Sequence, residues 1–335
     1  MNIDRLETWF ITHKRELNFR GVNNPYFIWV SEIMLQQTQA ETVEPYFEKF
    51  IKLYPTIQSL AEAKLEEVLK TVEGIGYYRR FKLMYQAAKE IVTHHEGIFP
   101  QTYEEVIQLK GIGKYTAGAI MSIAYNQPYS ALDGNVVRVL SRYLADSGDM
   151  RKDKEKKRLD TYNQRMIEKA HPRIYTEAMI ELGAIICKPR QPKCDICPLN
   201  EHCVAYLNDE VDQYPFLSKL KKQKAFSYIV FVLFDDDFYY VRKRSESLLE
   251  GMYEWPQFEH ESYYAALDEL SACGMETEII DDLGHYQHVF SHQIWEMNTF
   301  LVRVIHGSCS KYIKIPKDKL KDYPMAIAHR KIKIA

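Results

Sequence analysis

Four of the six cysteines fall in one short run, and no other feature limits what this chain can fold into as strongly. They are Cys187, Cys194, Cys197 and Cys203, separated by six, two and five residues. Disulfides are uncommon inside cells, so four thiols this close together indicate a bound metal centre. Zinc usually takes two close pairs of cysteines separated by a longer loop, whereas one compact run after a helix suits an iron–sulfur cluster. The spacing favours the cluster and leaves zinc as the alternative.

The length and composition are those of two globular domains. The chain has 335 residues, of which 46% are hydrophobic and 27% charged. We expect no signal peptide, because the first residues lack a basic start followed by an apolar stretch. We also expect no membrane span, because the sequence contains no run of about 18 apolar residues. In an intracellular chain, Cys273 and Cys309 are expected to be ordinary buried thiols.

Apolar periodicity predicts helix after helix up to about residue 205, with Gly or Pro at nearly every junction. The expected helices cover residues 4–17, 28–38, 57–72, 78–94, 103–109, 115–124, 135–145, 154–169 and 174–186. The pattern then changes to β-branched and aromatic residues. A hairpin is expected from 226–234 and 238–242, then a helix over 262–273 and strands over 278–287 and 293–304. We predict a helical domain (1–205), a linker (206–225) and a smaller α+β domain (226–335).

A Gly-x-Gly turn joins two of the expected helices. Gly111 and Gly113 lie in the string LKGIGKYTA, where the missing Cβ atoms let backbone N–H groups approach a phosphate. Such a turn is a weak signal alone. Asp133 follows in LDGNVVRVL, just before a helix, where an Asp is usually only an N-cap.

A second carboxylate, Glu32, lies in the string SEIMLQQTQ among apolar neighbours. Burial there would raise its pKa and keep it protonated, as a general acid requires. The alternative is an ordinary Glu on the exposed face of a helix. Another ambiguous stretch runs from Arg151 to Arg158: it is basic and suits phosphate contacts, but also a solvated helix face.

Together these motifs resemble the MutY family of adenine DNA glycosylases over most of residues 5–205. The resemblance implies a mainly α, helix-hairpin-helix glycosylase fold with a [4Fe–4S] cluster on the four cysteines. It implies a catalytic role for Glu32 and Asp133, which Asn135 and Tyr115 would orient. It also implies DNA contacts by Gln37, Tyr77, Gly111, Gly113 and the basic loop with Lys188 and Arg190, and an adenine pocket with Arg20 and Glu177. For Tyr77 the alternative is core packing.

The carboxy-terminal domain resembles a Nudix fold that has lost its catalytic residues. The stretch 248–258 is similar to the entry into that fold, but the following helix carries only Asp268 and Glu269, not the acidic metal-binding box. Phe290, Ser291 and His292 match the Phe-Ser-His loop with which the family senses 8-oxoguanine. Taken alone, Phe290 could be a core residue and His292 a strand-edge residue.

The expected protein is a monofunctional glycosylase that removes adenine opposite 8-oxoguanine or guanine in double-stranded DNA. Tyr115 replaces the lysine with which bifunctional relatives form a Schiff base. We expect a monomer in the cytoplasm, associated with the nucleoid in a bacterium. Two alternatives stay open: a mismatch thymine glycosylase, and a non-catalytic iron–sulfur module that binds DNA or senses redox state.

Overall fold

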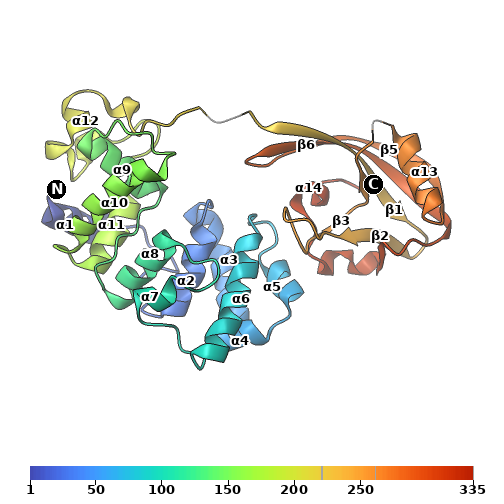
Figure 1. The fold of residues 1–335 in the computed structure, drawn as a ribbon, viewed down its shortest axis with the longest axis horizontal. Helices are drawn as coiled ribbons and strands as arrows, with labels where there is room; N and C mark the ends of the chain where they lie inside the picture. The colour runs from blue at the N-terminus through green and yellow to red at the C-terminus, as the bar shows by residue number, and fades with distance from the viewer. Residues whose placement is uncertain (220–221, 261, 335) are drawn as a thin grey trace. The chain divides into compact units, whose positions relative to one another are not determined.

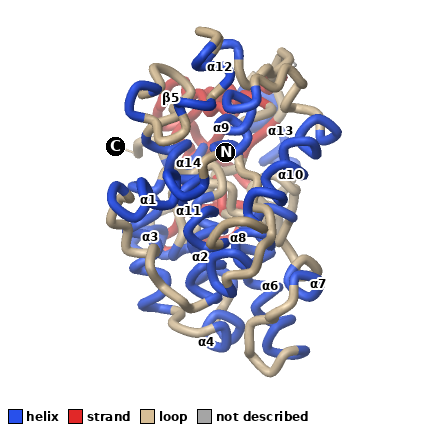
Figure 2. The backbone as a smooth tube through the Cα atoms, turned by 90° about the vertical axis from the view of Figure 1, so that its left-hand side faces the viewer, coloured by secondary structure: helices blue, strands red, loops and turns tan. Residues whose placement is uncertain are grey.

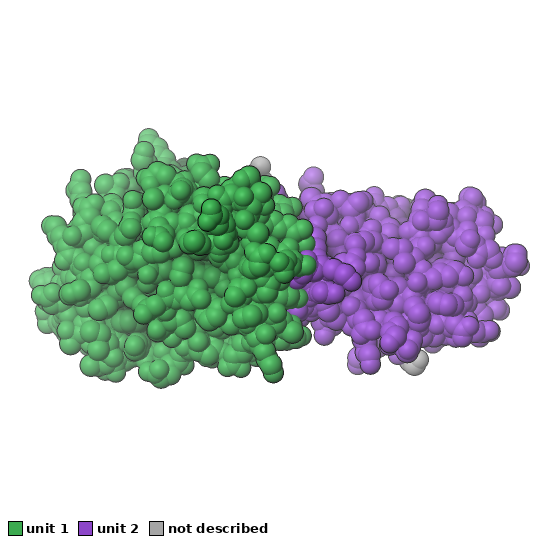
Figure 3. Space-filling model, turned by 90° about the horizontal axis from the view of Figure 1, so that it is seen from below, with its two compact units in different colours: residues 1–62, 83–220 green, residues 63–82, 221–335 purple. Residues whose placement is uncertain are grey.

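The computed structural model describes residues 1–219, 222–260 and 262–334. Two compact units are present: unit 1 comprises residues 1–62 and 83–220, and unit 2 comprises residues 63–82 and 221–335 (Figures 1 and 3). The predicted linker and the predicted α+β domain include residues 220, 221, 261 and 335, which lie outside the described residues. Within the described ranges, no helix is long and apolar enough to cross a membrane.

Unit 1 is helical, as the sequence predicts (Figure 2). Its core forms where α1, α9 and α11 pack together, with Leu6, Leu140 and Leu182 fully buried. The α-helices are α1 (Ile3–His13), α2 (Pro25–Leu35), α3 (Ala40–Leu53), α4 (Ile57–Glu62), α6 (Arg79–His94), α7 (Tyr103–Val106), α8 (Lys114–Tyr125), α9 (Gly134–Leu144), α10 (Asp153–Ile167), α11 (Pro172–Ile185) and α12 (Val204–Leu207). Short 3-10 turns cover Cys194–Ile196, Asn200–His202 and Val211–Gln213.

Two helical predictions need correction. The helix expected over 57–72 is two helices, α4 and α5 (Leu65–Thr71), with Lys64 in an extended conformation between them. The break coincides with the boundary between units 1 and 2, so its two halves pack with different units. Helix α3 is not predicted at all, although Val43, Phe47 and Phe50 form its buried stripe.

Unit 2 is built on a mixed sheet with the strand order β3-β2-β1-β6-β5, in which β4 pairs with β1 and β7 pairs with β2. The predicted hairpin is confirmed by the antiparallel pairing of Leu233 with Tyr240. Strands β1 and β6 are parallel neighbours. The strands are β1 (Lys224–Phe234), β2 (Phe238–Lys243), β3 (Tyr253–Glu254), β4 (Gln257–Phe258), β5 (Met275–Val289), β6 (Gln293–Gly307) and β7 (Ile313–Pro316).

Each face of the sheet has its own hydrophobic cluster. Helix α13 (Tyr263–Ala272) buries Ala266 and Leu270 in the cluster that contains Phe231. The other cluster contains Val230, Trp255 and Trp295 and receives the 3-10 turn Lys317–Asp322 and α14 (Ile327–Arg330). Successive side chains of β1 point to opposite faces of the sheet, so β1 contributes residues to both clusters.

Residues 63–82 also belong to unit 2. The Glu73 carboxylate accepts a hydrogen bond from the Met325 N–H at 3.0 Å, and Lys70 Nζ donates to the Tyr323 carbonyl at 3.2 Å. Lys82 lies 3.1 Å from Glu250. These contacts attach α5 and the following turn to the sheet domain.

The expectation for Cys273 and Cys309 is wrong, because the two are joined in a disulfide with their Cα atoms 5.4 Å apart. Cys273 ends α13, and Cys309 follows β6. The pairing of Met275 with Gly307 aligns the start of β5 with the end of β6, which brings the flanking cysteines together.

Candidate active site

Glu32 is buried at the centre of unit 1. It lies on α2, which begins with Asn24 as its N-cap and is apolar on nearly every side. Glu32 is only 6% exposed, so the alternative of an ordinary Glu on the exposed face of a helix is wrong. Burial raises its pKa to about 7, assisted by the charges of Asp133 and Glu177 and opposed by a hydrogen bond from Tyr115 and the charge of Arg20. A carboxyl with such a pKa is suited to general-acid chemistry near neutral pH.

Asp133 is both an N-cap and a neighbour of Glu32. Its Oδ1 accepts the Val136 N–H at 2.7 Å, which starts α9, and its Oδ2 accepts from Asn135 Nδ2 at 2.9 Å. Burial raises the pKa of Asp133, while these donors favour its ionised form. The structural role of an N-cap is therefore compatible with a place in the site.

Tyr115 connects the two carboxylates to the glycine turn. It is the second residue of α8, whose N-cap is Gly113, and its hydroxyl donates to Glu32 Oε2 at 2.6 Å. Burial and the charges of Glu32 and Asp133 hold its pKa well above the usual value. The structure thus brings Glu32, Tyr115 and Asp133 together from three helices.

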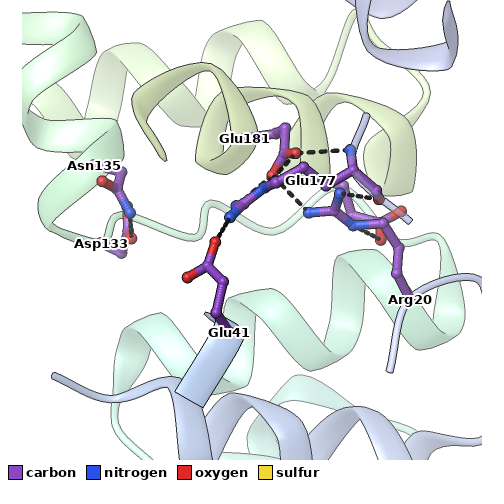
Figure 4. A network of polar contacts seen from close by, with 7 residues as sticks. Arg20, Glu41, Asp133, Asn135, Glu177 and Glu181 are labelled. Carbon is purple, nitrogen blue, oxygen red and sulfur yellow. Dashed lines mark hydrogen bonds and ion pairs between the residues drawn. The ribbon is translucent and has the colours of Figure 1, made fainter. Parts of the chain in front are cut away.

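Arg20 and Glu177, the two residues predicted for an adenine pocket, lie close together. Arg20 Nε lies 3.7 Å from Glu177 Oε1 (Figure 4). The Arg20 guanidinium also lies over the Phe10 ring. Burial raises the pKa of Glu177, although Arg20 and Arg173 oppose that change. Both groups act on the pKa of Glu32, so this pair adjoins Glu32.

Sequence reasoning missed Arg15 and Glu181, which complete this network. Glu181 is fully buried and accepts hydrogen bonds from Arg15 and Arg20. Arg15 also binds Glu41 at 2.7 Å. A signal was present: Glu181 is four residues after Glu177, so both carboxylates lie on one face of the predicted helix.

The four predicted metal ligands line one cavity in unit 1 together with apolar residues such as Val139, Leu182 and Leu199. Burial raises the pKa of the Cys194 and Cys203 thiols and that of Cys197 to about 12. Four sulfur donors around one apolar cavity fit an iron–sulfur cluster, which when bound would hold the loop through metal–thiolate bonds.

Two arginines of α9, also missed, attach the cysteine loop to the rest of unit 1. Arg142 is 3% exposed and donates to the carbonyls of Lys188 and Tyr214 at 2.7 and 3.0 Å. Arg138 donates to the Cys187 carbonyl at 2.7 Å and to Asn135 Oδ1 at 2.9 Å. The spacing of four residues places both on one side of α9.

The predicted DNA-contacting residues of unit 1 lie on its surface. Lys188 and Arg190 are exposed on the loop between the first two cysteines, and Gln37 is exposed after α2 with a φ of +58°. Gly111 has a φ of +81°, and a Cβ there would lie 2.7 Å from Leu83 Cβ. Gly113 faces open space.

The basic side chains of the stretch Arg151–Arg158 lie in two kinds of surroundings. Arg158 pairs with Asp146 at 2.6 Å, and Arg151 donates to the Ser218 carbonyl at 2.6 Å. Three of the four lysines between them line a hollow of about 670 Å³ beside Tyr115 and Lys114; they are Lys154, Lys156 and Lys157.

Within unit 2, Tyr77 and the Phe-Ser-His residues line one hollow of about 470 Å³. Tyr77 is 49% exposed and has a φ of +51°, which excludes a place in the core. Phe290 lies between β5 and β6 with its ring 4.9 Å from that of Trp295, while Ser291 and His292 are exposed. The loop is therefore anchored by its aromatic residue and open at the other two.

Comparisons with known proteins match three parts of the chain to known families. Residues 30–164 match the HhH-GPD superfamily base excision DNA repair proteins, 187–203 the iron-sulfur binding domain of endonuclease III, and 229–335 the NUDIX domain. The adenine DNA glycosylase of Buchnera aphidicola from Acyrthosiphon pisum is 35% identical over 87% of this chain and 83% of its own. The chain belongs to the adenine DNA glycosylase family. The family member of Schizosaccharomyces pombe is 32% identical, over 81% of this chain and 71% of its own.

Solved structures support the fold of the helical part of this adenine DNA glycosylase family member. A thermostable thymine-DNA glycosylase is similar with a TM-score of 0.57 and 26% identity, covering 62% of this chain and 95% of its own. An endonuclease III–DNA complex is similar with a TM-score of 0.53 and 24% identity, covering 62% of this chain and 94% of its own. The family match identifies the four cysteines as ligands of an iron–sulfur cluster.

Proposed function

We propose that this protein is a monofunctional, monomeric adenine DNA glycosylase that acts on genomic DNA and removes adenine paired with 8-oxoguanine or guanine. The observation that carries the proposal is the buried meeting of Glu32, Tyr115 and Asp133 beside Arg20 and Glu177. Cleavage of an N-glycosidic bond needs a proton for the departing base and a negative charge near the sugar cation, as in sugar hydrolysis. One protonated and one ionised carboxyl meet both needs.

In the proposed mechanism, adenine is extruded from the duplex into the site. Glu32 donates its proton to N7 of adenine, and the Asp133 carboxylate stabilises the positive charge that develops at C1′. Asn135 holds Asp133 by its amide, and Tyr115 holds Glu32 by its hydroxyl. Arg20 and Glu177 line the side of the pocket that receives the base.

The DNA is held by several surfaces in this proposal. The N–H groups near Gly111 and Gly113 and the exposed Lys188 and Arg190 bind phosphates. Gln37 and Tyr77 insert into the duplex near the lesion. Since Tyr115 has no amine, no Schiff base forms and strand cleavage is not part of the reaction.

Recognition of 8-oxoguanine is assigned to Phe290, Ser291 and His292. Ser291 is exposed and has a hydroxyl for the purine edge, and Phe290 holds the loop against the core. The presence of Tyr77 in the same hollow supports this assignment, because a wedge and a reader of the opposite base would act at one site.

The proposal is tested by single-turnover excision from duplexes containing A opposite 8-oxoguanine, A opposite G, and T opposite G. We expect adenine release from the first two only, with no borohydride-trapped product. Glu32→Gln should lower excision by at least about a hundredfold with DNA affinity unchanged, because the amide is not acidic enough to protonate the base. Turnover by that variant, or preference for T opposite G, would contradict the proposal.

Ser291→Ala tests the assignment of the lesion reader. It should reduce the preference for 8-oxoguanine over guanine several-fold and leave the A opposite G rate unchanged. A matched control is Ser262→Ala, at the exposed N-cap of α13 in the same unit. An equal effect of the two substitutions would contradict the assignment.

A further inference from the structure

We propose that Glu181 is a positioning residue for base excision: its buried carboxylate holds the guanidinium of Arg20 and limits how strongly that positive charge acts on Glu32. The inference rests on the proposed function and concerns a residue outside the carboxylate pair. The alternative is a purely structural role, in which Glu181 only holds the segment after α1 against α11.

The contacts of Glu181 are unusually complete. Its Oε1 accepts the backbone N–H and the Nε–H of Arg15, both at 2.9 Å. Its Oε2 accepts from Nη2 of Arg15 and Nη2 of Arg20, again at 2.9 Å (Figure 4). Burial alone would raise the pKa of Glu181, but these donors outweigh it and lower the pKa to about 2. Glu181 is therefore a fixed negative charge throughout the pH range in which the enzyme works.

Arg20 is held on every side that the structure describes around it. Nη2 binds Glu181, Nη1 donates to the Arg15 carbonyl at 3.1 Å, Nε faces Glu177 at 3.7 Å, and the guanidinium plane lies over the Phe10 ring. A guanidinium fixed in this way cannot swing toward a nearby carboxylate. Its orientation is thus set mainly by Glu181, the shortest of its carboxylate contacts.

The consequence concerns Glu32. The groups that act on it are Tyr115 on α8, Asp133 at the start of α9, Glu177 on α11 and Arg20 after α1. Among these, Arg20 is the positive charge and stabilises the ionised form of Glu32. A general acid must be protonated, so the stabilisation of ionised Glu32 by Arg20 must stay weak. The adjacent negative charge of Glu181 keeps it weak, because a guanidinium paired with a carboxylate acts less strongly on Glu32.

The test is the pH profile of single-turnover adenine excision with saturating enzyme. In Glu181→Gln the positive charge of Arg20 is less compensated, so the pKa of Glu32 falls and the loss of rate begins at lower pH. We expect the midpoint to move down by about half to one pH unit, which lowers the rate above that midpoint by about three- to tenfold. Glu41→Gln is the matched control: it also removes a partner of Arg15, but its side chain is 66% exposed and its midpoint should not move.

Two further variants separate the alternatives. Adding Arg20→Gln to Glu181→Gln removes the uncompensated charge, so the midpoint should return upward even though the maximal rate falls. If Glu181→Gln does not fold, Arg15→Gln provides the opposite test: Glu181 then compensates Arg20 alone, and the midpoint should rise.

The inference is overturned if Glu181→Gln loses rate or stability with an unchanged midpoint, or if the Arg15→Gln midpoint stays in place or falls. Its failure is distinct from failure of the proposed function. In the first case the native enzyme still excises adenine with a Glu32-dependent pH profile, whereas in the second the native enzyme shows neither.

Discussion

The hydroxyl of Tyr115 opposes burial in setting the protonation of Glu32. It donates to Glu32 Oε2 at 2.6 Å and lowers a pKa that burial raises to about 7. Tyr115→Phe removes that donor, so the pKa of Glu32 should rise further. In the proposed mechanism the protonated acid is the active form, so excision falls as pH rises through this pKa, and the variant should keep its activity to higher pH.

This prediction is measured by single-turnover rates between about pH 6 and pH 9. Tyr125→Phe is a suitable control, since Tyr125 is on the same helix and its hydroxyl donates to the Pro100 carbonyl at 3.0 Å, away from the carboxylates. A Tyr115→Phe midpoint equal to or below the native one would show that the hydrogen bond does not tune the acid.

Residues were predictable where a local motif surrounds them. Glu32, Asp133 and the four cysteines each lie in a recognisable string. The spacing of Glu177 and Glu181 placed both on one helix face, but the pairing of Glu181 with Arg15 joins positions 166 apart, which no local pattern reports. The Cys273–Cys309 disulfide was missed for the same reason: its partners meet only because β5 and β6 align.

At the scale of elements, the two glycines before α8 are expected to have different roles, one in stability and one in DNA binding. Gly111 has a φ of +81° and lacks room for a Cβ, which would lie 2.7 Å from Leu83 Cβ. Gly111→Ala should therefore lower the free energy of unfolding by roughly 1–3 kcal/mol. Gly113 has a φ of −97° and open space around it, so Gly113→Ala should cost less stability but weaken DNA binding, since its methyl group blocks the approach of a phosphate.

Urea unfolding and titration with an uncleavable duplex separate the two effects. Equal losses of stability in both variants would contradict the steric argument. Native DNA affinity in Gly113→Ala would remove the turn from the proposed DNA interface.

Element boundaries were predicted best where a cap marks them. Helix α9 begins after Asp133 and α8 after Gly113, close to the expected positions. Helix α3 was missed even though its apolar residues have helical spacing; Pro45 lies inside it. The split between α4 and α5 could not be read from periodicity, because it reflects which unit each half packs against.

At the scale of the whole molecule, the change from helical to strand patterning between residues 205 and 226 predicted the two kinds of structure. It did not predict that residues 63–82, within the helical half of the sequence, join unit 2. That grouping depends on polar contacts such as Glu73 with the Met325 N–H, which only the folded chain brings together.

This grouping predicts that removing the sheet domain affects α5 in the helical half of the sequence. A chain ending at residue 220 lacks Tyr323, Met325 and Arg330, the partners of Lys70 and Glu73. We expect the amides of α5 to exchange with solvent faster than in the full chain, because these polar contacts with the sheet domain are lost, while the core of α9 and α11 keeps its protection. Hydrogen-exchange mass spectrometry of both chains measures this directly. Glu73→Gln in the full chain should give a smaller effect of the same sign, and unchanged protection of α5 in the truncated chain would show that residues 63–82 are ordered without the sheet domain.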